Sequence, residues 1–71
     1  MRERGVIKLW KSESAWGFIR LEGAGRPDAF MHLSKFKHRP TVDPQEGDRV
    51  EFDLIEQADG RMRAEGITFV D

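Results

Sequence analysis

Four side chains that can stack on a flat ligand alternate along two short apolar runs of this sequence. Trp16 and Phe18 lie in SAWGFIRL, and Phe30 and His32 lie in DAFMHLS. Successive side chains of a β-strand point to opposite faces of its sheet, so an extended conformation would carry each pair of rings on one face. Rings in such a row either fill a hydrophobic core or form an exposed surface on which nucleobases stack.

Ionisable side chains on the same faces favour the exposed arrangement. Arg20 continues the first aromatic row, and Asp28 precedes the second row at the same spacing. Burying such groups in a small domain would be costly unless every one were paired. The opposite faces suit a core, because they carry Ala15, Gly17, Ile19, Leu21, Ala29, Met31 and Leu33. We therefore predict that the aromatic faces lie outside, where clustered apolar rings mark a binding site.

Neither catalysis nor metal binding is expected from these residues. Asp28 and His32 are four positions apart on one strand face, too far along a strand to form a hydrogen-bonded pair. No serine or cysteine nucleophile accompanies them in the sequence. The chain has no cysteine and two histidines, which is a poor ligand set for a metal. We expect a protein that is not an enzyme and that uses no cofactor.

Positive charge gathers in the first part of the chain. Residues 1–42 contain nine Lys and Arg against four acidic residues, a balance of +5, whereas residues 43–71 have a balance of −6. Segregation of ordinary surface charge is one explanation. The other is a cationic face beside the aromatic runs, formed by Lys8, Lys11, Arg20, Lys35, Lys37 and Arg39. Rings beside cations fit single-stranded nucleic acid, and the net charge of −1 predicts that stacking outweighs phosphate neutralisation.

Five strands are predicted from period-two alternation and from turn residues. Their ranges are 5–10, 16–21, 29–33, 49–56 and 61–69. Segment 22–28 is glycine-rich and is predicted to be a loop, and 58–60 is predicted to be a hairpin turn. Pro40 and Pro44 exclude a long helix, so a short turn near 34–36 should lead into an irregular loop. A closed or nearly closed barrel is favoured, because a flat sheet would expose an apolar face.

Length and composition predict one domain over residues 1–71. A length of 71 residues is near the lower limit at which one hydrophobic core can stabilise a domain. No cysteine is available for a disulfide. The N-terminal residues contain no apolar run long enough for a signal peptide or a membrane span. We expect a cytoplasmic protein without membrane contact by this domain. A monomer is expected, and a dimer that exchanges strands through the loop 37–47 is the alternative.

Motifs along the chain resemble those of a bacterial cold-shock domain, the branch of the OB-fold that binds single-stranded nucleic acid. AWGFI and DAFMHLS are similar to the family's first and second ribonucleoprotein-type motifs, and GVIKLW, EGDRVEFDL and RAEGI resemble other strands. The resemblance covers about residues 5–70. An RNA-recognition motif carries its corresponding motifs in the reverse order. The resemblance therefore implies an all-β fold, a five-stranded antiparallel OB-fold barrel.

The resemblance also implies a role for particular residues. It implies stacking by Trp16, Phe18, Phe30 and His32, with Lys8 beside them and Trp10 a weaker member. With the neighbouring charged residues added, the expected nucleic-acid-binding residues are Lys8, Trp10, Trp16, Phe18, Arg20, Asp28, Phe30, His32, Lys37 and Arg39. The expected core residues are Ile7, Ile19, Ala29, Met31, Phe36, Val50, Phe52, Leu54 and Ile67. The expected partner is single-stranded RNA or DNA, bound with tolerance for sequence. Such binding would melt weak secondary structure, as an RNA chaperone does.

Several positions depart from the family pattern. Leu9 and Leu33 stand where stacking or surface aromatic residues are usual, Ala15 replaces a glycine, and Ser14 replaces a lysine. Segment 37–42 lacks the aromatic residue that is often found in this loop. We expect these changes to shorten the site or to weaken binding.

A peptide-binding barrel of the SH3 type is the alternative interpretation. It would use the same exposed rings to bind proline-rich segments. Such a site favours acidic neighbours, whereas the charged neighbours of these rings are mostly basic. Nucleic-acid binding is therefore the stronger prediction.

Overall fold

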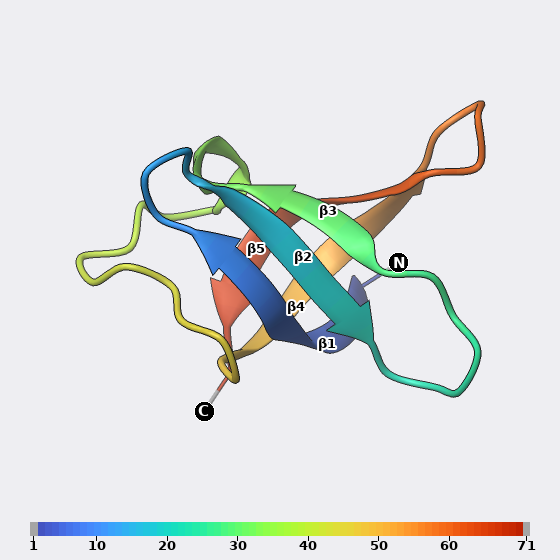
Figure 1. Ribbon diagram of the computed structural model, residues 1–71, viewed down its shortest axis with the longest axis horizontal. Coiled ribbons are helices and arrows are strands. Elements are labelled where there is room, and N and C mark those ends of the chain that lie inside the picture. Colours follow the sequence, from blue (N-terminus) through green and yellow to red (C-terminus); the bar gives the residue numbers. More distant parts are fainter. Residues whose placement is uncertain (1, 71) are drawn as a thin grey trace.

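The computed structural model describes residues 2–70, which form a small closed barrel (Figure 1). The strands are β1 (Arg2–Lys11), β2 (Trp16–Leu21), β3 (Ala29–His32), β4 (Arg49–Glu56) and β5 (Met62–Phe69), and a 3-10 helix η1 (Leu33–Lys35) follows β3. Around the barrel the strands lie in the order β1-β2-β3-β5-β4. The predicted all-β closed barrel is confirmed. Within residues 2–70, no helix is long and apolar enough to cross a membrane.

One strand pair differs from the predicted antiparallel arrangement. β1 pairs antiparallel with β2 and β4, and β2–β3 and β4–β5 are antiparallel as well. β3 and β5 are parallel, with Ala29 opposite Met62 and Phe30 opposite Arg63. These two strands are not consecutive in the chain, so no hairpin turn forces them to run in opposite directions. The barrel therefore closes through a short parallel contact.

The core is formed by the strand faces that the alternation predicted. Among residues 2–70 the buried hydrophobic side chains are Ile7, Ile19, Leu21, Ala29, Met31, Phe36, Val50, Phe52, Ala64 and Ile67, and no charged or polar side chain is buried. Leu54 was expected in the core but is only partly buried and packs against it. Pro44 is also almost fully buried, so the long loop contributes to the core. The remaining expected core residues are confirmed.

A β-bulge at Lys8 changes which side chains of β1 face inward. The register with β2 shifts at this point, so that Leu9 lies opposite Phe18 and Trp10 lies opposite Gly17. A Cβ atom at Gly17 would overlap the carbonyl oxygen of Leu9 and would lie 3.0 Å from Cε3 of Trp10. Glycine therefore allows β1 to approach β2 closely at the bulge.

Arginine side chains of β1 link the N-terminal strand to β4 and β5. Arg4 Nε donates to Glu51 Oε2 at 3.1 Å, and Arg2 Nε donates to Oε1 at 3.5 Å. Arg2 also donates to the carbonyl oxygen of Gly66 at 2.8 Å and to Thr68 Oγ1 at 3.1 Å. The hydrogen bond from Arg4 is the main cause that holds the pKa of the Glu51 carboxyl below its ordinary value of 4.5. The charged form of Glu51 therefore stabilises the fold.

The turn between β1 and β2 holds an alanine in a conformation that favours glycine. Ala15 has φ 61°, the only positive φ of a non-glycine residue among residues 2–70. Its N–H donates to the carbonyl oxygen of Lys11 at 2.7 Å, and its own carbonyl accepts the N–H of Leu33 at 2.9 Å. These bonds fix the strained conformation, which costs an L-residue about 1–2 kcal/mol.

We predict that Ala15→Gly stabilises the protein by about 1 kcal/mol, because glycine adopts this φ without steric cost. Urea denaturation compares the variant with the wild type. The matched control is Ala24→Gly, since Ala24 is exposed in the loop after β2 and has no positive φ. The control should lose stability, because glycine adds freedom to the unfolded chain. A destabilised Ala15→Gly protein would contradict the prediction.

We predict that Glu51→Gln reduces the loss of stability on acidification. The folded-state pKa of Glu51 lies below 4.5, so its contribution is complete above that pH and disappears as the pH falls through the folded-state pKa. Denaturant midpoints at about pH 7 and about pH 3 measure the effect. The wild type should lose more stability between these conditions than the variant does. Equal losses would show that Glu51 makes no such contribution.

Candidate nucleic-acid interface

Trp16, Phe18 and Phe30 form one contiguous group of rings, here called the ring cluster. The Trp16 and Phe30 rings are stacked, with centroids 6.2 Å apart and planes at 27°. Phe18 meets Trp16 edge-on at 5.8 Å and meets Phe30 edge-on at 5.8 Å. Each ring thus contacts the other two, so the cluster presents a single apolar surface.

The pairing of β2 with β3 creates this cluster. Phe18 lies directly opposite Phe30, and Trp16 lies directly opposite His32. The residues between them, Gly17 and Met31, are buried, and the Met31 side chain points to the other face. Phe30 is 37% exposed, and Trp16, Phe18 and His32 are partly exposed. Trp16, Phe18, Phe30 and His32 therefore lie on the same face of the β2–β3 pair.

Trp10, expected as a weaker stacking member, is half-buried and makes no ring contact with the cluster within residues 2–70. Its indole is partly buried and packs against the core. Its Cε3 atom lies on the inward side of Gly17, and Nε1 is buried without a hydrogen-bond partner. After the bulge at Lys8, Trp10 lies opposite the buried Gly17, and Leu9 lies opposite Phe18.

An ion pair occupies one edge of the ring cluster. Lys8 Nζ lies 3.0 Å from Asp28 Oδ2. The sequence predicted that both groups contact a ligand, whereas here the two groups contact each other. The Lys8 side chain is 60% exposed and that of Asp28 is 31% exposed. Arg20, outside on β2 and opposite Val6, is exposed and forms no ion pair within residues 2–70. Arg20 can therefore contact phosphate without breaking an existing pair.

Three further cations without an ion pair within residues 2–70 come from the end of β1 and from the segment after β3. Lys11 lies opposite Trp16, and Lys35 ends η1 directly after β3. Lys37 is exposed, and its N–H donates to the carbonyl oxygen of Ile67 at 2.9 Å. Within residues 2–70 none of these lysines forms an ion pair, which leaves their charge available to a phosphate chain.

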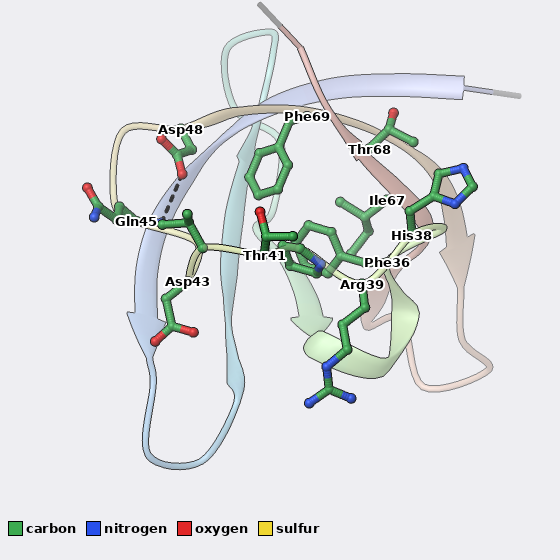
Figure 2. A pocket seen from close by; sticks show the side chains of 12 residues that line it. Phe36, His38, Arg39, Thr41, Asp43, Gln45, Asp48, Ile67, Thr68 and Phe69 are labelled. Carbon is green, nitrogen blue, oxygen red and sulfur yellow. Dashed lines mark hydrogen bonds between the residues drawn. The ribbon is translucent and has the colours of Figure 1, made fainter.

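Arg39 lies on a different part of the surface from the ring cluster. It belongs to the long loop after η1, which lines a hollow of ≈ 620 Å³ together with Phe36, Ile67 and Phe69 (Figure 2). The Phe36 and Phe69 rings are 5.3 Å apart within this hollow. The loop therefore places Arg39 beside this separate apolar hollow. None of Trp16, Phe18 and Phe30 lines this hollow.

His32 connects the ring cluster to η1. Its Nδ1 accepts the backbone N–H of Ser34 at 3.1 Å and lies 2.9 Å from Ser34 Oγ, so His32 is the N-cap of this helix. An acceptor nitrogen carries no proton, and the neutral ring must then hold its proton on Nε2. His32 thus offers a ligand one N–H donor in a fixed tautomer.

Strand β5 supplies neighbours of the cluster that the sequence patterns did not indicate. Met62 and Arg63 reach the Phe30 side of the surface through the parallel pairing of β3 with β5. No local motif marks this contact, because it joins segments that are distant in the chain. Within the described residues 2–70, no group of three acidic or histidine side chains is placed to hold a metal ion.

Comparison with known proteins identifies the fold family. Residues 3–70 match the family model of the 'Cold-shock' DNA-binding domain. The chain belongs to the cold-shock domain family. Cold shock protein ScoF of Streptomyces coelicolor is 39% identical over 64 residues, which cover 90% of this chain and 92% of that protein. The cold shock-like protein CspLB of Listeria monocytogenes is 35% identical over 66 residues, covering 93% and 96%.

A solved structure supports the same assignment. Drosophila Unr CSD456 matches all of this chain with a TM-score of 0.78 and 28% identity, and the match spans 27% of that longer chain. The barrel is therefore an OB-fold, as the resemblance implied. Cold-shock domains generally bind nucleic acid, which makes this the general function of the domain.

This cold-shock domain has a reduced set of rings. Leu9 lies beside Phe18 on the outside, and Leu33 is partly buried against the core. Neither position supplies a ring, so the aromatic part of the surface is limited to Trp16, Phe18 and Phe30, with His32 beside them.

We predict that neutral His32 is protonated on Nε2 and not on Nδ1. Long-range ¹H–¹⁵N correlation spectra of the neutral ring, recorded at about pH 9, distinguish the two tautomers. His38 is exposed in the long loop and makes no side-chain hydrogen bond within residues 2–70, so it provides an internal control with mixed tautomers. A proton found on Nδ1 of His32 would show that the cap at Ser34 does not form in solution.

Proposed function

We propose that this protein binds single-stranded RNA or DNA by stacking successive bases on the ring cluster and on His32. The observation that carries the proposal is the continuous contact among Trp16, Phe18 and Phe30 on the outer face of β2 and β3. Stacking is worth about 1–3 kcal/mol per base and is largely indifferent to base identity. Sequence-tolerant binding of unpaired strands follows.

The charges around the cluster support a binding mode in which stacking dominates. Lys8 is held by Asp28, whereas Arg20, Lys11 and Lys35 are unpaired within residues 2–70 and flank the rings. A few phosphates can thus be neutralised while most of the free energy comes from the rings. Lys37 and Arg39 extend the cationic surface toward the long loop in this proposal.

Binding of the open strand alone would shift base-pairing equilibria toward the open state. A ligand preference of this kind melts weak secondary structure by mass action, without consuming energy. We therefore assign the protein an RNA-chaperone-like role, exerted in the cytoplasm by a monomer. The membership of the cold-shock domain family favours this function over the peptide-binding alternative.

Phe18→Ala and Phe30→Ala are each expected to weaken the binding of an oligo-dT heptamer about 5- to 150-fold, which corresponds to the loss of one stack. Titration followed by tryptophan fluorescence measures the affinity. The chain has two tryptophans, so a Trp10→Phe background leaves Trp16 as the single source of the signal. Phenylalanine keeps a ring where Trp10 packs against the core.

Thermal unfolding serves as the control for these variants. Phe18 is partly exposed and Phe30 is 37% exposed, so their truncation should cost less stability than Phe52→Ala, whose side chain is fully buried. The loss for Phe52→Ala is expected to be about 3–5 kcal/mol. If Phe18→Ala and Phe30→Ala unfold instead of losing affinity, the rings are structural and the proposal fails.

Salt dependence should be shallow. Single-stranded ligands give a slope of log K against log salt of about −0.7 for each neutralised phosphate. Because few unpaired cations border the rings, we expect a slope between about −1 and −3 for the heptamer. A slope steeper than about −5 would mean that phosphate contacts, and not stacking, carry the affinity.

A further inference from the structure

A hollow of ≈ 640 Å³ adjoins the ring cluster on its β5 side. Phe18, Phe30 and Asp28 line it, together with Met62 and Arg63 of β5. Its volume lies within the range of ordinary ligand sites. The hollow therefore continues the stacking surface into a recess that also contains hydrogen-bonding groups.

Arg63 is held in a defined orientation in this recess. It is the register partner of Phe30, and its Nη2 lies 2.8 Å from Glu65 Oε2. Its Nε is buried without a hydrogen-bond partner within residues 2–70. The Arg63 side chain is only 36% exposed, while that of Arg61 in the same hollow is 81% exposed and pairs with Asp59. Glu65 is the one side-chain partner of Arg63 within residues 2–70, so the Nη1 hydrogens and the second hydrogen of Nη2 remain for a ligand, in the geometry of a fork.

Asp28 supplies an acceptor in the lining of the hollow. Its Oδ2 accepts from Lys8 Nζ at 3.0 Å, which leaves Oδ1 without a partner within residues 2–70. Lys8 also keeps the carboxylate in place, because the ion pair spans β1 and the residue just before β3. The hollow therefore combines a stacking wall, a donor fork and an acceptor.

We propose that this hollow is a guanine-reading subsite at the end of the stacking surface, an inference that rests on the proposed function. Guanine carries two adjacent acceptors, O6 and N7, which match a guanidinium fork, and its N1–H and N2–H groups can donate to Asp28. Adenine presents a donor beside N7 and so mismatches the fork. One end of an otherwise sequence-tolerant site thereby selects a base.

Oligo-dT heptamers with a single guanine placed at each position in turn test this subsite. The wild type should bind one guanine position about 5- to 100-fold more tightly than oligo-dT, as expected for one bidentate contact. Replacing that base by 7-deazaguanine, which lacks N7, should remove most of the gain. Arg63→Ala and Arg63→Lys should bind oligo-dT as the wild type does but lose both the guanine preference and the sensitivity to N7.

Arg61→Ala is the matched control, since it removes the same charge from the same hollow. It should keep the guanine preference, and thermal unfolding should show that all variants are folded. Oligo-dT binding without any guanine preference would overturn the subsite and leave the proposed function intact. A guanine preference that persists in Arg63→Ala would overturn the assignment to Arg63. A guanine preference that is lost in Arg61→Ala and kept in Arg63→Ala would overturn it as well. A wild type that binds none of the strands would overturn both proposals.

Discussion

The surface of this domain depends on the register in which β2 pairs with β3. Ile19, Ala29 and Met31 are 0% exposed, and their burial fixes which face of each strand is inside. The opposite positions must then lie outside, where Phe18 meets Phe30 across the pair. A slip of one residue would exchange the two faces and bury the charged side chains without partners. The core thus positions the ring cluster, and the rings need not hold the fold together.

A local irregularity in β1 adjusts this arrangement. The bulge at Lys8 pairs Leu9 with Phe18 and Trp10 with Gly17, and Gly17 provides the space for the close approach. The indole of Trp10 packs against the core, so the ring cluster consists of the rings of β2 and β3. The Lys8 ammonium at this bulge binds Asp28.

Ion pairs across the barrel decide which charges remain available. The excess of cations in residues 1–42 suggested one basic face, yet Arg2 and Arg4 bind Glu51 of β4, and Arg26 binds Glu3. These pairs join segments up to 49 residues apart in the chain. Sequence patterns indicate how many charges exist, but only the fold indicates which of them face a partner.

The sequence by itself determined the strands of the barrel, most of its core and the outward direction of Trp16, Phe18, Phe30 and His32. These features follow from period-two alternation, which is a local property of each strand. The tertiary structure alone decided the parallel contact of β3 with β5, the inward turn of Trp10, the Lys8–Asp28 pair and the position of Arg63 beside Phe30. Each of these depends on register or bulges between strands, and side-chain alternation along one strand does not encode them.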